Sequence, residues 1–356
     1  MSDIEKVLKY LKECSTGIND QKYGNFEGMN LSGADLSGAN LRKANLGGAN
    51  LSGANLYEAN LSNAYLIGAN LSSAFLSRAN LSLSKLIGAN LIRANLNGTN
   101  LSEAILTDAD LSETNLKRAN LKKAKMERAN LIGADLRNAC LNGAVLFKAI
   151  LSKANLKDAD LEWTNLSGVD LTNANLMDSF LTRSYLKDAN LSEANLSDAI
   201  LSEAYLCNAN LTGANLSRAY LKNSNLSEAN LCRANLTDAN LTGAILSKAN
   251  LNKATLKSAQ LRDADLSWAD LSNADFSYAY LSYAYLFCAN LSDANLGGAV
   301  LMHTDLRNAN LTNANISDSN KINAELYGAT LEPRDFKPPE VNQEEFERNE
   351  EGDIIF

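Results

Sequence analysis

Leucine recurs at every fifth position of this chain from Leu31 to Leu331, without a single insertion or deletion. Of these 61 positions, 57 hold leucine, and the others hold Met126, Phe276, Ile316 and Lys321. The residue two places before each leucine is alanine at 50 of 60 positions, and the residue between the two is mostly Asn or Asp. The repeating unit is therefore Ala-(Asn/Asp)-Leu followed by two variable residues.

A period of five fits neither an α-helix nor a continuous β-strand. Five helical residues turn the chain by about 500°, so successive leucines would not share one face. In a strand, an odd period would send alternate leucines to opposite sides of the sheet. Both conflicts disappear if three residues of each repeat are extended and the chain turns a right angle at the other two. Four repeats then close a square coil of 20 residues, and stacked coils enclose a core of Leu and Ala.

Tandem Ala-(Asn/Asp)-Leu-x-x units of this number and regularity resemble the pentapeptide-repeat family, and the resemblance covers most of the chain. It implies an all-β solenoid, the right-handed quadrilateral β-helix. We expect about 15 coils over residues 26–331, which at a strand spacing of about 4.8 Å give a rod roughly 70 Å long.

The two variable residues of each repeat form the predicted turn. Glycine fills the second turn position at 33, 38, 48, 53, 68, 88 and 98, which indicates a type II turn with positive φ. Later repeats more often carry Lys, Arg, Asp or Glu at that position. We therefore expect a different turn type in the later coils.

Residues 1–25 are predicted to cap the first coil. Ile4, Val7, Leu8 and Leu11 follow the i, i+3, i+4, i+7 spacing of an amphipathic helix, which we place at about residues 3–14. Asp3 is the expected N-cap of this helix. Phe26 is expected to begin the repeats.

Residues 332–356 form an acidic, proline-containing C-terminal tail or cap. This segment contains all three prolines, nine acidic residues and three basic residues. Its apolar residues either fold back onto the last coil, or the segment is disordered. These apolar residues are Phe336, Phe346, Ile354, Ile355 and Phe356.

The formal net charge of −8 is concentrated in the acidic tail, which carries −6, whereas residues 26–331 carry only −2. The repeat body therefore has no general attraction for nucleic acid or for an anionic membrane. The N-terminus lacks the apolar centre of a signal peptide, and no apolar stretch approaches the ~18 residues of a membrane span. Five scattered cysteines without a C-x-x-C pair indicate free thiols, so the expected location is the cytoplasm.

Candidate catalytic chemistry is sparse. His303 is the only histidine, and no nucleophile elbow, P-loop, metalloprotease or dinucleotide motif is present. Acidic residues recur with the repeat, so close carboxylate pairs arise without an acid–base role. Stacked outward amides, such as Asn50, Asn70 and Asn90, are expected to bond along the rod. The sequence predicts no enzyme, no cofactor and no metal site.

The four sides of the predicted coil differ in their outward central residues. We number them face 1 (residues 30, 50, 70 and so on), face 2 (35, 55, 75), face 3 (40, 60, 80) and face 4 (45, 65, 85). Faces 1 and 2 are Asn or Asp nearly throughout, and their apolar exceptions are Phe75 and Ile150. Faces 3 and 4 carry thirteen apolar or aromatic residues, one of them Cys140.

The candidate interaction residues combine these two faces with the aromatic stretch at 268–287. They are Tyr65, Ile105, Val145, Phe180, Tyr185, Ile200, Tyr205, Tyr220, Ile245, Trp268, Tyr278, Tyr280, Tyr283, Tyr285, Phe287 and Val300. Two interpretations remain open, because outward apolar side chains either stabilise β ladders or bind a partner protein or a second copy of the chain. A basic cluster at 117–128 is either a solvated patch or a contact for phosphate or an acidic partner.

Three functions are consistent with the sequence. The leading hypothesis is a non-enzymatic scaffold that binds another protein, or itself, through a rigid surface. The resemblance offers a second, because some members mimic duplex DNA, bind gyrase and confer quinolone resistance, but this nearly neutral, loop-free body departs from their pattern. The third is an inert structural spacer. Long, leucine-rich members also resemble those abundant in cyanobacteria, which suggests a bacterial protein.

Overall fold

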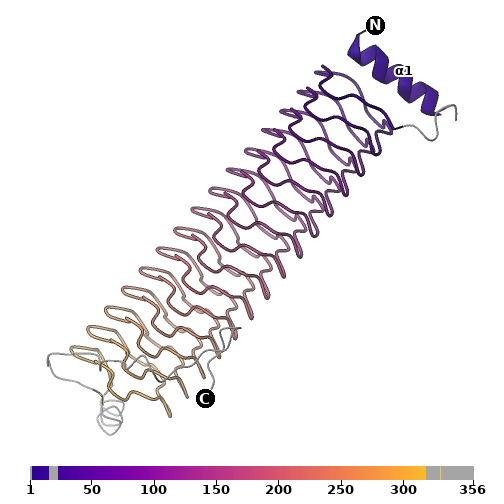
Figure 1. The fold of residues 1–356 in the computed structure, drawn as a ribbon. Helices are drawn as coiled ribbons and strands as arrows, with labels where there is room; N and C mark the ends of the chain where they lie inside the picture. Colours follow the sequence, from indigo (N-terminus) through magenta and orange to yellow (C-terminus); the bar gives the residue numbers. More distant parts are fainter. Residues whose placement is uncertain (1, 16–22, 318–328, 330–356) are drawn as a thin grey trace, which may run out of the picture.

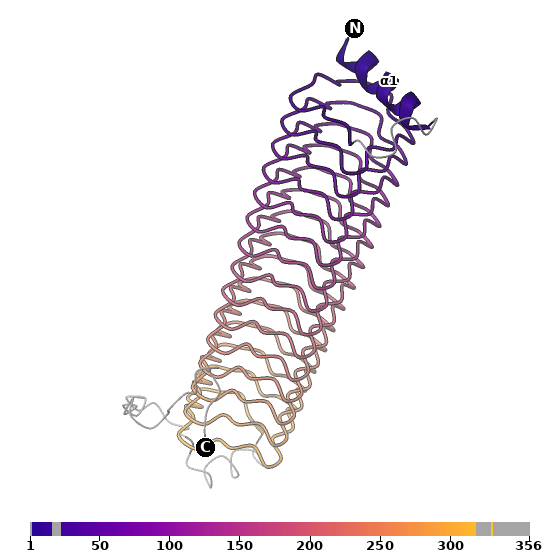
Figure 2. The same cartoon turned by 45° about the vertical axis from the view of Figure 1, so that its right-hand side comes forward.

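The computed structural model describes residues 2–15, 23–317 and 329 of the chain. Its repeats form a straight rod of stacked coils, and a single helix, α1 (Asp3–Ser15), lies across the N-terminal end (Figures 1 and 2). Each coil has four short extended segments joined by two-residue turns. The expected β solenoid with one N-terminal helix is confirmed.

The register between coils is 20 residues throughout. Parallel β-bridges pair each outward central residue with the residue 20 positions later, from Asn25 with Asn45 to Asn295 with Asn315. Four repeats per coil are therefore confirmed. The total of about 15 coils and the domain boundaries at 25/26 and 331/332 stay predictions, since 318–328 and 330–356 lie outside the described residues.

The core is a column of leucine and alanine along the rod axis. Every leucine of the repeat from Leu31 to Leu296 is at most 1% exposed. Each buried leucine contributes roughly 2 kcal/mol of apolar burial, so the core is a large stabilising term for so narrow a body. Where Ser or Thr replaces the inward alanine, its hydroxyl bonds a backbone carbonyl, as Ser179 Oγ donates to Leu176 O at 2.6 Å.

The predicted change of turn type along the rod is wrong as far as φ is concerned. The second turn residue has a positive φ in early and late coils alike, 63° at Gly68 and 59° at Arg233. This conformation lets its N–H reach the next coil, and Lys43 N donates to Ser62 O at 2.9 Å as Gly33 N does to Ser52 O. The left-handed region costs a non-glycine residue roughly 1–2 kcal/mol, which the inter-coil hydrogen bond offsets.

Helix α1 covers the first coil, but two details of its prediction are wrong. Val7 is fully buried and Tyr10 packs edge-on against Phe26 at 5.2 Å between ring centroids, whereas Leu8 is 46% exposed. The N-cap is Ser2 and not Asp3, because Ser2 Oγ accepts from Glu5 N at 3.2 Å and Ser2 N donates to the Glu5 carboxylate. This reciprocal capping box leaves the Asp3 carboxylate to accept from Asn30 N at 3.1 Å, which ties α1 to the rod.

Candidate interaction surface

The outward residue of each repeat has a structural role of its own. In the repeat 50–54, the N–H groups of Asn50, Leu51, Gly53 and Ala54 donate to carbonyl oxygens at 2.7–3.0 Å. The fifth, from Ser52 at the first turn position, donates to Oδ1 of Asn50 at 3.1 Å. We call this fifth group the corner N–H. An outward Asn or Asp therefore satisfies the only backbone donor that the coil geometry leaves unpaired.

Amide side chains also bond along faces 1 and 2. Asn50 Nδ2 donates to Asn30 Oδ1 at 3.1 Å, and Asn70 Nδ2 donates to Asn50 Oδ1 at 3.2 Å. Asn90 has the backbone bridge to Asn70, but no hydrogen bond joins the two amides in the described residues. The predicted amide ladder is therefore confirmed from Asn30 to Asn70 and does not extend to Asn90.

Apolar outward residues leave the corner N–H without a cap. Phe180, Ile200 and Tyr220 occupy face 3 on three consecutive coils. Their corner N–H groups belong to Thr182, Ser202 and Lys222. No acceptor within the described residues bonds these three groups, nor the corner N–H groups of Lys187 and Cys207, which follow Tyr185 and Tyr205 on face 4. Faces 3 and 4 therefore present backbone donors beside apolar side chains.

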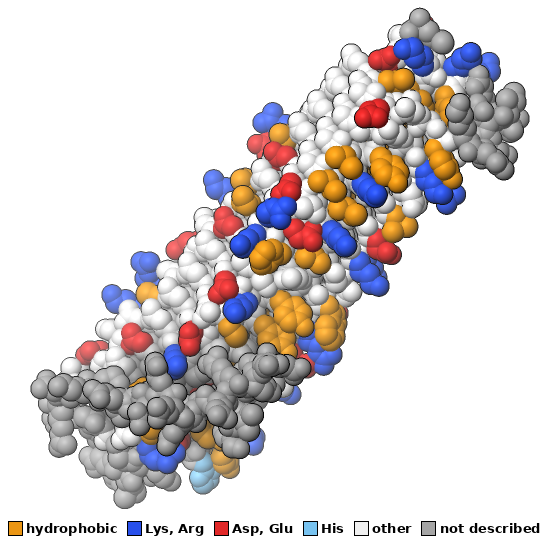
Figure 3. All heavy atoms as spheres, viewed as in Figure 1, with side chains coloured by type: hydrophobic (Ala, Val, Ile, Leu, Met, Phe, Trp, Pro, Cys, Tyr) orange, Lys and Arg blue, Asp and Glu red, His pale blue; other side chains and the backbone are white. Residues whose placement is uncertain are grey.

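The sixteen candidate residues, which we call the apolar strip, all lie at the surface. Eleven are exposed, and the other five are half-buried: Ile105, Val145, Ile200, Trp268 and Phe287. The coil register brings some of them into contact, and the rings of Tyr185 and Tyr205 stack at 5.1 Å between centroids. Figure 3 shows hydrophobic side chains in groups between charged ones along the rod.

The stretch from Trp268 to Phe287 gathers aromatic rings over faces 3 and 4 and the adjoining turns. Trp268 contacts Phe287 edge-on at 5.7 Å. Tyr283 stacks on His303 at 5.0 Å, and the Arg262 guanidinium lies 5.4 Å from the Tyr283 ring centroid. These contacts fix the rings while Tyr283 stays 41% exposed. His303 therefore has a packing role within this cluster.

Sequence reasoning missed exposed apolar residues in the turns between faces 3 and 4. Leu83, Trp163 and Met302 are 49%, 49% and 55% exposed. The guanidinium of Arg183 lies over the Trp163 ring at 4.9 Å. The prediction considered mainly outward central positions, but the turn residues that join the two faces were equally visible in the repeat register.

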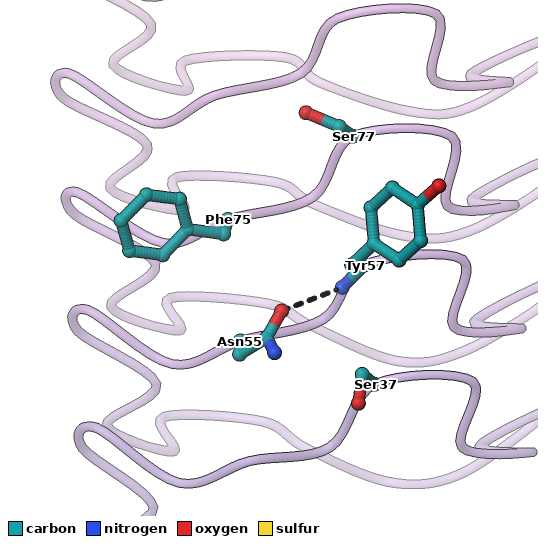
Figure 4. A pocket seen from close by; sticks show the side chains of 5 residues that line it. All are labelled: Ser37, Asn55, Tyr57, Phe75 and Ser77. Atoms are coloured by element: carbon teal, nitrogen blue, oxygen red, sulfur yellow. Dashed lines mark hydrogen bonds between the residues drawn. The ribbon is translucent and has the colours of Figure 1, made fainter.

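A shallow, open depression lies on face 2 near the N-terminal end. The rings of Tyr57 and Phe75 flank it, with Asn55 and two serines between them (Figure 4). Asn55 Oδ1 accepts from Tyr57 N at 3.2 Å, so the amide already caps its own corner. The depression does not enclose a ligand, and none of its residues is a catalytic acid, base or nucleophile.

The basic cluster at 117–128 is only partly paired. Lys117 lies 3.2 Å from the Asp135 carboxylate, and Arg128 forms a two-bond pair with Asp108. Burial raises the pKa of Asp135, but hydrogen bonds from Arg137 and Lys117 outweigh it and leave the pKa below its ordinary value. The other four basic residues of the cluster are exposed, and no carboxylate of the described residues forms an ion pair with them. They are Arg118, Lys122, Lys123 and Lys125.

Reactive groups within the described residues are few. Burial raises the pKa of the Cys140 and Cys288 thiols, so both stay protonated near neutral pH. Residues 2–15, 23–317 and 329 contain no cluster of His, Cys, Asp and Glu that fits a metal ion. The same part of the chain contains no helix with the length and apolarity to cross a membrane.

The fold is a repeat solenoid, and its surface consists of columns of side chains that stack every 20 residues. The family model of pentapeptide repeats matches ten segments between residues 25 and 320, most of which overlap. The chain therefore belongs to the pentapeptide-repeat family, whose known structures are right-handed quadrilateral β-helices. No curated protein matches the chain in sequence.

Solved structures of the same family resemble parts of the chain. The pentapeptide-repeat protein HetL of the cyanobacterium Nostoc sp. strain PCC 7120, involved in heterocyst differentiation regulation, is 31% identical, with 71% of this chain and 89% of HetL covered and a TM-score of 0.23. Rfr23 of the cyanobacterium Cyanothece 51142 is 43% identical over 25% of this chain and 58% of its own, with a TM-score of 0.19. The fluoroquinolone resistance protein QnrB1 is 19% identical, with 55% and 95% covered and a TM-score of 0.36.

Proposed function

We propose that the chain is a non-enzymatic scaffold that binds another protein through the apolar strip on faces 3 and 4. The observation that carries this proposal is the uncapped corner N–H beside the outward apolar residues of faces 3 and 4, such as Tyr185, Tyr205 and Tyr220. A partner that covers the strip gains apolar burial, and its carbonyl or carboxylate oxygens have unpaired donors to meet.

Ladder stabilisation alone is a weaker account of the strip. Exchanging Asn for an apolar residue gives up a corner hydrogen bond worth roughly 0.5–1.5 kcal/mol. The cross-strand contact that replaces it is worth roughly 0.2–1 kcal/mol. If ladders were the only requirement, the exchange would have no reason to favour two adjacent faces. Its concentration on faces 3 and 4 instead supports selection for a contact surface.

The test replaces Tyr185, Tyr205, Tyr220 and Tyr280 together by Asn. Each Asn restores a corner cap, so we expect the midpoint of thermal unfolding to stay within a few degrees of the wild type. We expect the variant to lose at least tenfold in capture of its partner, measured by quantitative mass spectrometry of affinity-purified complexes from the host. A change of Phe75, Ile150 and Thr255 to Asn on faces 1 and 2 is the matched control and should capture normally.

Two results would count against this function. A large loss of stability in the four-tyrosine variant would assign the aromatic residues to ladder packing. Equal capture by wild type and variant, with equal mass in solution, would make the strip inert and favour a structural spacer.

A further inference from the structure

A second surface on the rod, separate from the aromatic rings, has the chemistry of an anion-binding site. Residues 115–134 contain six basic residues and one acidic residue, whereas the rest of residues 26–331 contains 20 basic and 27 acidic residues. Lys117 and Arg128 are neutralised by Asp135 and Asp108. The remaining four, Arg118, Lys122, Lys123 and Lys125, are exposed and without an ion-pair partner among the described residues. We call these four residues the basic coil.

The basic coil spans faces 3 and 4. Arg118 lies in the turn before face 3, Lys122 and Lys123 lie in the turn between the two faces, and Lys125 is an outward residue of face 4. Two carboxylates lie near these four basic residues: Glu127, which accepts from Thr107 Oγ1 at 3.0 Å, and Glu103, which occupies the turn position one coil before Lys123. This side of the rod therefore keeps an excess of positive charge.

Apolar side chains flank this charge. Lys125 pairs through backbone bridges with Ile105 in the preceding coil and with Val145 in the following coil. Phe147, in the turn that follows Val145, is 39% exposed. A ligand that satisfies the whole surface therefore combines carboxylates with apolar side chains. An inorganic anion would use only part of it.

One segment of the chain has this composition. Residues 332–356 carry nine acidic and three basic residues, with Phe346, Ile354, Ile355 and Phe356 among the acids. The segment lies outside the described residues. Its net charge of −6 complements the basic coil, and its aromatic and branched residues match the apolar flanks.

Distance favours a segment from a second copy over the chain's own segment. From Lys125 to Ile316 the rod rises through roughly nine to ten coils, or about 46 Å at a strand spacing of about 4.8 Å. Even a random-coil chain of 36 residues, the number from 317 to 353, has a root-mean-square span of only about 30–36 Å. Docking on its own rod would hold such a chain beyond that span, whereas docking of a second copy needs no stretching and instead costs the entropy of association.

We propose that the basic coil binds the acidic segment 332–356 of a second copy of this chain. This docking shares Ile105 and Val145 with the apolar strip, but its charged contacts are separate from the four tyrosines that test the proposed function. Failure of one experiment therefore does not decide the other.

The test is zero-length cross-linking of full-length protein, which joins carboxylates to lysine amines in direct contact. Equal amounts of unlabelled and ¹⁵N-labelled chain are mixed, and cross-linked peptides are identified by mass spectrometry. We expect links from segment 332–356 to Lys122, Lys123 and Lys125 to exceed links to Lys153, Lys253 and Lys257 at least fivefold. Peptide pairs of mixed label should appear at the frequency of random pairing, and 1 M salt should abolish the preference.

Charge reversal supplies the matched comparison. Reversal of the basic coil (R118E, K122E, K123E, K125E) should remove the preferred links, whereas K153E, R233E, K253E and K257E change the net charge equally and should retain them. Changing Glu344, Glu345, Glu347 and Glu350 to Lys in the coil-reversed chain should restore mixed-label links with the charges exchanged. Links spread evenly over all exposed lysines, links within one label only, or no rescue by the exchange would each overturn the proposal.

Discussion

The capping of corner N–H groups leads to a quantitative prediction at Asn210 on face 1. Asn210 Oδ1 accepts from Thr212 N at 3.1 Å and from Thr212 Oγ1 at 2.7 Å, and its amide donates to Asn190 Oδ1 at 3.1 Å. Asn210→Val removes all three hydrogen bonds and leaves the Leu and Ala core unchanged. Three partly exposed bonds at the low end of 0.5–1.5 kcal/mol each give a local loss of about 2 kcal/mol.

Hydrogen–deuterium exchange resolves this loss at a single corner. A local loss of about 2 kcal/mol corresponds to roughly thirtyfold faster exchange of the Thr212 N–H. Peptides three or more coils away should be unaffected, because coils couple mainly to their neighbours. Asn210→Asp is the matched control, since it keeps the Oδ1 acceptor and loses only the amide donor. We expect it to retain most of the protection at Thr212.

The converse substitution is made on face 3. Tyr220→Asn supplies the missing cap for Lys222 N, so exchange at that group should slow severalfold. Exchange at Thr212 that stays within twofold of the wild type in the Asn210→Val variant would refute the capping account. Faster exchange at Lys222 in the Tyr220→Asn variant would refute it as well.

Three further predictions concern the core, the turns and the ion pairs. Leu206→Ala opens a cavity beside a fully buried position and should cost about 2–5 kcal/mol, measured as loss of exchange protection in the coils around residue 206. Gly68→Ala meets no neighbouring atom but keeps a φ of 63°, so it should destabilise by about 1 kcal/mol from backbone strain alone, seen as faster exchange at residues 66–70. The hydrogen bond from Arg128 lowers the pKa of Asp108 below its ordinary 3.8, so the pair stabilises the fold above about pH 4 and is lost as pH falls through the lowered pKa. Wild type should therefore exceed Asp108→Asn in thermal midpoint at pH 6, and the difference should disappear once the pH is below the lowered pKa of Asp108.

The period of five predicted the coil and its core because leucine burial leaves few alternatives. Once Leu31 and its equivalents must face inward together, the chain has to turn within each repeat. Ser179 occupies an inward position of this core, and its hydroxyl donates to a backbone carbonyl. The amphipathic spacing also located α1 to within one residue at its C-terminal end.

Other features depend on competition that the periodic pattern does not reveal. The turn conformation was mispredicted because the prediction tied positive φ to glycine. In the structure, non-glycine residues such as Lys43 also have a positive φ, because their backbone N–H groups donate to the next coil. Ser2 outcompetes Asp3 as N-cap because Asp3 is drawn to Asn30 of the first coil. The corner caps were visible in the sequence as an Asn or Asp two positions before the first residue of each turn, which is the spacing of an Asx-turn. Their significance emerges only when every backbone donor is traced to its acceptor.

The repeat pairs many of its own amides and some of its charged groups along the rod, and this limits where partners can bind. Arginines in the turns bond carboxylates 20 residues away, as Arg183 does with Glu203 and Arg218 with Asp198, so charge is neutralised between coils. Amides on face 1 cap their corners and one another in the same way. Where side chains are paired in this way, the surface offers a partner little beyond what water already provides. Binding is therefore expected where the pairing fails, which is at the uncapped corners of faces 3 and 4 and at the basic coil.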